Sequence, residues 1–392
     1  MRTLGYGRGF LCLPGRSAYL REMDYLPFYS LAPQHDLIRS ELNNCFRKLM
    51  DRGNFILGDE VAGLEAEWAT FTGVKHCIGV ANGSDAITLS LRALGIGAGD
   101  EVMVPALTCS PTWMAVAAAG AKLIPVDVEM SSGLIRPDLV EAQLTSRVKA
   151  IVPVHLYGQS VDMQPLIELS NRFAVPLIED NAQGHGARCG ERMTGSMGLL
   201  GATSFYPTKN LGALGDGGAI TTQDDQLAIT LRQMRNYGSS IRFHHEIKGV
   251  NSRLDEWQAA VLRIKLKYLE GWNAARKQVA CQYLEELVNA GDIQWQGGAN
   301  QSGANHHLVV IRTQHRDALK AWLHQHDIGT DVHYPLPPHL QRSFSDYGFR
   351  PGQFPAAEEW ASTVLSLPAW PGLTSLQVSR VCDAIRSFYH KR

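Results

Sequence analysis

The stretch VPLIEDNAQGHG at residues 175–186 is the most informative part of the sequence, because an apolar run ends abruptly in two carboxylates and a string of polar groups. This pattern is typical of a buried β-strand whose carboxyl end carries ligand-binding groups. Burial raises the pKa of a carboxyl unless a cation or a hydrogen-bond donor compensates it. Asp180 therefore indicates a positive partner, such as a protonated ring nitrogen. The alternative is an aspartate that caps the following turn.

Short apolar runs alternate with helical segments from Cys77 to about Thr222, and this alternation predicts a doubly wound α/β domain. The predicted strands are Cys77–Val80, Glu101–Val104, Lys122–Val126, Ala150–Val154, Val175–Ile178, Thr203–Phe205 and Gly218–Thr221. The predicted helices between them are Ser84–Leu94, Ser110–Ala119, Pro137–Leu144 and Met163–Phe173.

The remaining segments define the expected domain organisation. Apolar residues at steps of three or four from Leu254 to Tyr268 predict one long amphipathic helix that leads to a second domain. That domain contains a proline-dense loop at residues 333–339, which cannot be continuous helix or central strand. We expect a dispensable extension at residues 1–22 before a native start at Met23, a large domain with an N-terminal arm at residues 23–271, and a small domain at residues 272–392.

Two further segments follow predicted strands. At residues 80–85, VANGSD, a helix begins after a glycine, and the free N–H groups of a helix start suit a phosphate; a serine N-cap is the alternative. At residues 204–218, Lys209 precedes a glycine-rich turn, and lysine forms Schiff bases when its pKa is lowered, although a lone lysine is usually solvated. A phosphate seat, a buried carboxylate and a lysine at the ends of strands of one sheet are the contacts that pyridoxal 5′-phosphate requires.

Composition excludes several classes of protein. The 392 residues are 45% apolar and 19% charged, and 37 basic against 38 acidic side chains give a formal charge of −1. This balance argues against a nucleic-acid or membrane partner, and no apolar run reaches the roughly 18 residues that span a bilayer. Seven scattered cysteines without a CxxC pair indicate neither disulfides nor a metal site, so we expect a cytoplasmic protein.

Seven stretches in order carry a resemblance to a known family; they lie at residues 55–58, 82–86, 99–102, 154–158, 179–183, 209–212 and 249–255. Together they resemble the DegT/DnrJ/EryC/StrS sugar aminotransferases over about Leu26 to Tyr389. The resemblance implies fold type I of the pyridoxal-phosphate-dependent transferases. In this α/β fold, helices flank the mixed, mostly parallel sheet of a large domain, and a smaller α+β C-terminal domain follows.

The resemblance also implies roles at the cofactor. Lys209 would bind its aldehyde as an imine and move the substrate proton, Asp180 would pair with the pyridinium nitrogen, and Gln183 would lie near the ring. Related dehydratases carry histidine in place of the lysine, so the presence of Lys209 favours transamination. L-glutamate would donate the amino group, and an oxo-sugar would accept it.

The phosphate and the subunit contact follow from the same resemblance. Asn251 would reach the phosphate of the neighbouring subunit, so that a homodimer would share its active sites; a turn-stabilising asparagine is the alternative. Within one subunit the phosphate would contact three small residues, Gly83, Ser84 and Ser204. Serine stands at position 84 where the family usually has threonine, and the hydroxyl is kept.

One departure concerns the ring face of the cofactor. Family members commonly carry an aromatic residue at the position of Cys109, where the ring stacks on the cofactor. Trp113, one helical turn further on, would be a substitute, although an aromatic there is more often a core or substrate-wall residue. The sequence therefore does not identify a side chain that stacks on the cofactor ring.

The loop at residues 333–341, HYPLPPHLQ, is similar to that of members acting on C3-oxo nucleotide sugars, notably dTDP-3-oxo-6-deoxyhexoses. A C4-oxo sugar or a scyllo-inosose-like ring stays open as the substrate. So do a pyridoxal-phosphate-dependent dehydratase or isomerase and a non-catalytic nucleotide-sugar binder as the function. The candidate substrate contacts are His339, Tyr157, His185, Asn236 and Tyr237.

Overall fold

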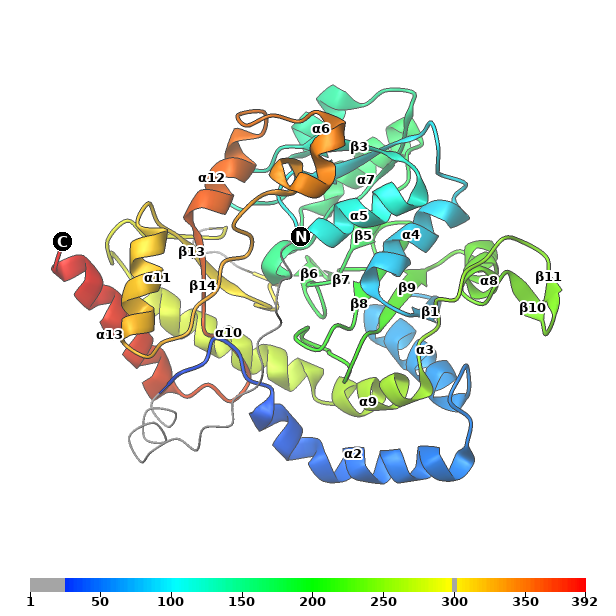
Figure 1. The fold of residues 1–392 in the computed structure, drawn as a ribbon, viewed down its shortest axis with the longest axis horizontal. Coiled ribbons are helices and arrows are strands. Elements are labelled where there is room, and N and C mark those ends of the chain that lie inside the picture. Colours follow the sequence, from blue (N-terminus) through cyan, green and yellow to red (C-terminus); the bar gives the residue numbers. More distant parts are fainter. Residues whose placement is uncertain (1–24, 298–301) are drawn as a thin grey trace, which may run out of the picture.

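The computed structural model describes residues 25–297 and 302–392, so the predicted extension at residues 1–22 lies outside the described residues. Two hydrogen-bonded segments, joined by bridges between Ile151 and Leu177 and between Val154 and Asp180, form the central sheet in the order β3-β2-β4-β5-β8-β9-β1 (Figure 1). Strand β9 runs antiparallel to all the other strands of this sheet. The strands are β1 (His76–Val80), β2 (Glu101–Pro105), β3 (Lys122–Val126), β4 (Val148–Ile151), β5 (Ile178–Asp180), β8 (Leu200–Ser204) and β9 (Gly218–Thr222).

Helices bury both faces of this sheet, which explains why its strands are nearly continuous apolar runs. In β2, Val102 and Val104 pack in a core with residues of the helices after β1 and β2, whereas Met103 points to the opposite core. The predicted doubly wound, mostly parallel architecture is thereby confirmed. The surrounding helices are α3 (Asp59–Thr72), α4 (Gly83–Ala93), α5 (Ser110–Ala119), α6 (Pro137–Gln143), α7 (Met163–Phe173) and α8 (Asp225–Met234).

Several predicted elements differ from the structure: β4 is Val148–Ile151 instead of Ala150–Val154, and β8 is Leu200–Ser204 instead of Thr203–Phe205. Strand β5 extends to Asp180 instead of ending at Ile178, because the backbone N–H of Asp180 donates to the oxygen of Pro153. The helix predicted from Leu254 to Tyr268 is α9 (Glu256–Leu266), and a second helix that was not predicted, α10 (Leu269–Glu286), follows it at once. Between the two helices, the N–H of Tyr268 donates to the oxygen of Lys265, three residues back, so the chain tightens for one turn and changes direction.

The C-terminal part forms its own antiparallel sheet, β12-β13-β14, against α10, α11 and α13 (Figure 1). The N-terminal helix α2 (Ala32–Arg52) packs along α9. The loop at residues 333–339 contains only a three-residue 3₁₀ turn at its end, as its prolines predict. These elements are β12 (Gln294–Trp295), β13 (Val309–Arg312), β14 (Val364–Leu367), α11 (Arg316–Gln325), α12 (Pro355–Thr363) and α13 (Ser375–His390).

Two small hairpins complete the fold: β6 (Arg188–Cys189) with β7 (Arg192–Met193), and β10 (Ser239–Ile241) with β11 (His244–His245). The second hairpin projects outward next to α8 (Figure 1). Within the two described ranges, no helix is both long and apolar enough to cross a bilayer.

Candidate active site

The N-terminus of α4 lies directly against the end of β8. A Cβ atom at Gly83 would approach the Cβ atom of Ser204 to 2.5 Å, so the glycine permits this close packing. Asn82 is the N-cap, since its Oδ1 accepts from the N–H of Asp85 at 2.8 Å. The predicted alternative of a serine N-cap at Ser84 is therefore wrong, and the hydroxyl of Ser84 does not cap the helix. Backbone N–H groups and two hydroxyls meet here, as an anion site requires.

Asp180 ends β5 as a buried carboxylate. The hydroxyl of Thr112 donates to its Oδ2 at 2.8 Å, and the backbone N–H of Ala182 donates to its Oδ1 at 3.1 Å. Burial raises the pKa of Asp180, although these hydrogen bonds and the nearby Lys209 act to lower it. Two neutral donors thus compensate the desolvation of this carboxylate only in part, and a cationic partner would stabilise its charged form.

The neighbouring Glu179, by contrast, has hydrogen-bond donors for both of its carboxylate oxygens. It accepts from the ring Nε2 of His155 at 2.8 Å and from the backbone N–H groups of Gly195, Met197 and Gly198 at 2.8, 2.6 and 2.7 Å. Burial acts to raise the pKa of Glu179, but these donors outweigh it and the pKa is lowered. Glu179 therefore fixes the β5 end of the sheet and has no free capacity for a ligand.

Lys209 projects from the loop after β8. A Cβ atom at Gly212 would lie 2.2 Å from the oxygen of Pro207, so the loop folds tightly back on itself. Burial lowers the pKa of Lys209, whereas Cys109 and Asp180 nearby act to raise it. In the part of the chain that the structure describes, its amine forms no hydrogen bond or ion pair. An amine in this state is less often protonated than an exposed lysine and is more nucleophilic.

Gln183 and Tyr334 connect the two sides of the site. The side-chain oxygen of Gln183 accepts from the backbone N–H of Tyr157, and its amide nitrogen donates to the hydroxyl of Tyr334 at 3.1 Å. The thiol of Cys109 is hydrogen-bonded to the same hydroxyl, and burial raises the thiol's pKa. Sequence reasoning singled out the loop at residues 333–341 but not Tyr334, because nothing in the local pattern distinguishes it from the loop's other side chains.

The other predicted site residues are either buried in the protein or at its surface. His185 is fully buried at the edges of Trp68 and Phe205, and His339 is 2% exposed with its Nε2 3.1 Å from a carboxylate oxygen of Glu358. Burial lowers the pKa of His185 to about 3. Tyr157 is buried with its hydroxyl donating to the backbone oxygen of His333, and Asn251 and Tyr237 are exposed while Asn236 is half-buried.

Trp113 is a core residue and no substitute for the missing stacking aromatic. It is fully buried, its indole N–H donates to the oxygen of Pro105 at 2.9 Å, and its ring packs edge-on against Phe344 and Phe349. The ring belongs to the core that α4 and α5 share. The favoured alternative of a core residue is therefore confirmed, and the stacking substitute is wrong.

These residues fit pyridoxal 5′-phosphate. The cofactor combines an anion, an aldehyde and a ring nitrogen that is cationic when protonated. The site provides a helix N-terminus with hydroxyls, an amine without a partner and an under-compensated buried carboxylate. Each group of the cofactor thus has a complementary group in the protein. No group of three or more potential metal ligands occurs among the described residues.

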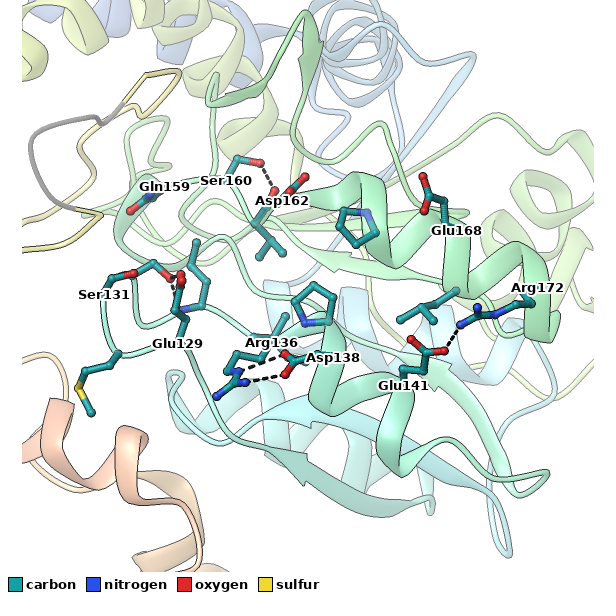
Figure 2. A pocket seen from close by; sticks show the side chains of 18 residues that line it. Glu129, Ser131, Arg136, Asp138, Glu141, Gln159, Ser160, Asp162, Glu168 and Arg172 are labelled. Carbon is teal, nitrogen blue, oxygen red and sulfur yellow. Dashed lines mark hydrogen bonds and ion pairs between the residues drawn. The ribbon is translucent and has the colours of Figure 1, made fainter.

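A large cleft of the described residues lies elsewhere. A cleft of about 1170 Å³ separates the segment at residues 129–141 from the segment at residues 159–172 (Figure 2). Each of its two arginines is paired with a carboxylate, Arg136 with Asp138 and Arg172 with Glu141. Three further carboxylates of the lining, Glu129, Asp162 and Glu168, are exposed. None of the predicted site residues lines this cleft.

Comparisons with known proteins bear on both the fold and the site. The DegT/DnrJ/EryC1/StrS aminotransferase family matches residues 36–386. The dTDP-3-amino-3,4,6-trideoxy-alpha-D-glucose transaminase of Streptomyces venezuelae is 44% identical over 94% of this chain and 97% of its own. The dTDP-3-amino-3,6-dideoxy-alpha-D-galactopyranose transaminase of Aneurinibacillus thermoaerophilus is 42% identical over 93% and 99%. The crystal structure of S. venezuelae DesV in complex with a ketimine intermediate superposes with a TM-score of 0.91 and 44% identity, covering 93% of this chain and 98% of that one.

Proposed function

The chain belongs to the DegT/DnrJ/EryC1/StrS aminotransferase family, and from this premise we propose that it transfers an amino group from L-glutamate to the C3 oxo group of a dTDP-linked deoxysugar. The cofactor is pyridoxal 5′-phosphate. The observation that carries the proposal is the unpartnered amine of Lys209 beside the buried carboxylate of Asp180. A lysine placed in this way is a nucleophile and a proton carrier, whereas a binding protein would have no need of it.

Each group of the site has a role in this reaction. When bound, pyridoxal 5′-phosphate supplies an electron-accepting ring that stabilises negative charge on the substrate carbon. Asp180 would keep a proton on the ring nitrogen, which the hydrogen bonds from Thr112 and Ala182 orient it to do. Lys209 Nζ would hold the aldehyde end and then move the proton of the substrate carbon. Gly83, Ser84 and Ser204 would hold the phosphate at the start of α4.

The sugar would lie between the loop at residues 333–334 and the side chains of Tyr157 and Gln183. Tyr157 is hydrogen-bonded to Gln183 and to His333, and Tyr334 is hydrogen-bonded to Gln183. These hydrogen bonds hold the hydroxyl-bearing wall of the proposed sugar site in place. His185 and His339 are both buried, so we do not propose a direct contact between either ring and the sugar. The relatives named for 3-amino sugars support C3 as the position of the oxo group.

We also propose that the active unit is a homodimer with shared sites, in the cytoplasm. Several large apolar side chains are exposed, and burying them against a second copy would be favourable. Asn251 is also exposed, so it could reach the phosphate in a partner subunit. The cysteines among the described residues are all free, as a reducing compartment requires. The exposed apolar residues are Phe55, Ile56, Tyr206, Leu214 and Tyr237.

Mass spectrometry of the products tests the reaction. The protein is incubated with L-glutamate and a panel of C3-oxo and C4-oxo sugars linked to dTDP or UDP. We expect amination of the dTDP-linked C3-oxo sugars with release of 2-oxoglutarate. Amination at C4 alone would replace the substrate assignment, and a dehydrated product without nitrogen would identify a dehydratase. Borohydride reduction followed by peptide mapping should place the cofactor on Lys209, and a binder would show neither the adduct nor turnover.

A further inference from the structure

Asn305 lies where three loops of the site meet. Its side-chain amide donates to the backbone oxygens of Gln183 at 2.8 Å and His185 at 3.0 Å. Its backbone N–H donates to the oxygen of Gly158 at 3.0 Å, and its backbone oxygen accepts from Nδ2 of Asn210 at 3.2 Å. Gln183 and His185 follow β5, Gly158 follows β4, and Asn210 follows β8. One residue of the C-terminal part therefore contacts every loop that carries Tyr157, Gln183 or Lys209.

The hydrogen bonds around Asn305 form a closed network. Its Oδ1 accepts from the N–H of His307 at 2.8 Å, and the ring Nδ1 of His307 donates to Oδ1 of Asn210 at 3.0 Å. Nδ2 of Asn210 also donates to Oδ1 of Asn273 at 2.8 Å, and Nδ2 of Asn273 donates to the oxygen of His185 at 2.9 Å. Asn305 is 2% exposed, so water does not replace these bonds readily. In such a buried network the loss of one member leaves several groups unpaired.

The space at Asn305 is fitted to this one side chain. Gly158 has φ +98°, and a Cβ atom there would lie 1.9 Å from Oδ1 of Asn305. The turn at residues 155–158 therefore packs directly on the amide. The same turn presents the N–H of Tyr157 to the side chain of Gln183. A shift of Asn305 would consequently be transmitted to both Tyr157 and Gln183.

Resting on the proposed function, we propose that Asn305 is a positioning residue that sets Lys209 relative to Gln183. Asn210, which it contacts, is the residue after Lys209, so the hydrogen bond to Asn210 holds the backbone next to the reactive amine. The network contacts neither the substrate carbon nor the amine itself. The network acts by fixing the backbone segments that carry Lys209 and Gln183. A displacement of a reacting group by about 1 Å can lower the rate about 10²-fold.

The test compares holoenzyme variants in steady-state kinetics and in the pH titration of the cofactor's visible absorption band. Asn305→Ser keeps a small polar side chain but cannot bridge Gln183 and His185, so we expect kcat to fall about 10- to 100-fold while KM for the sugar changes less than about threefold. We also expect the pH midpoint of the band to move, because the environment of Lys209 changes. Asn171→Ala, an exposed asparagine on α7, is the matched control and should leave all three quantities unchanged.

A second variant makes the test independent of folding. Asn210→Ala removes the connection to Lys209 but leaves the bonds of Asn305 to Gln183 and His185, and it should lower kcat and move the band in the same way. A lower melting temperature with unchanged kcat and band midpoint in either folded variant would overturn the proposal. Failure of both variants to fold would also overturn it, because the network would then serve stability alone. The band needs no sugar, so a wrong substrate assignment would leave this result intact.

Discussion

The end of the sheet around Asp180 and the cleft between α6 and α7 contain similar kinds of side chains but differ in how these are paired. In the cleft, Arg136 is paired with Asp138, and Arg172 is paired with Glu141 (Figure 2). At the sheet end, burial holds an amine without a partner close to a carboxylate that only neutral donors contact. The cleft has a volume of about 1170 Å³, but its arginines are paired and its remaining carboxylates, Glu129, Asp162 and Glu168, are exposed to water. Unsatisfied charge in a desolvated place, and not volume, identifies the reactive part of this molecule.

Removing the amine should have the largest effect. In Lys209→Ala we expect loss of measurable transamination and of the visible absorption band of the imine, because no other group is placed to bind the aldehyde. Glutamate turnover and the absorption spectrum are the measurements. Lys149→Ala, an exposed lysine of β4, is the control for the loss of one positive charge. Turnover that survives in Lys209→Ala would contradict the whole assignment.

Neutralising the carboxylate should have the next largest effect. Asp180→Asn can still accept from Thr112 but cannot hold a proton on a ring nitrogen, so we expect the cofactor to remain bound while both half-reactions slow by about 10²-fold or more. Single-turnover kinetics with glutamate and with the sugar would measure the two halves separately. Equal rates in the variant and the original protein would exclude the pairing of Asp180 with the ring.

The adjacent carboxylate should affect stability and not chemistry. Glu179→Gln places an amide against the backbone N–H groups of Gly195, Met197 and Gly198, and we expect a loss of roughly 3 kcal/mol in the free energy of unfolding. Because the pKa of Glu179 is lowered in the folded protein, its contribution is complete above the ordinary value of 4.5 and is lost as the pH falls below it. Denaturant titrations should therefore show the difference from the original protein shrinking below pH 4.5.

The paired charges of the cleft should matter least. In the double variant Arg172→Ala, Glu141→Ala we expect a change in unfolding free energy below about 1 kcal/mol, because both side chains are more than half exposed and water screens their attraction. Transamination rates should stay the same. A large fall in activity here would show that the cleft takes part in the reaction and would remove the distinction between the two regions.

Much of the site was predictable because it is local in the sequence. Asp180, Lys209 and Gly83 each follow a strand of the sheet, and the carboxyl ends of parallel strands meet at one edge. The start of α10 directly after α9 was not predicted, because only a tightened turn, in which the N–H of Tyr268 donates to the oxygen of Lys265, separates the two helices. The true end of β5 was also missed, because the pairing of Asp180 with Pro153 is a contact between distant segments.

The sequence by itself determined the α/β architecture, the family and the identity of the reactive groups, because these depend on apolar periodicity and on short motifs that each lie within one loop. Only the tertiary structure decided which of two adjacent carboxylates is saturated, that Trp113 faces the core, and that Thr112, Tyr334 and Asn305 complete the site. These properties depend on donors that approach from segments far apart in the chain, and no local pattern records where such segments meet.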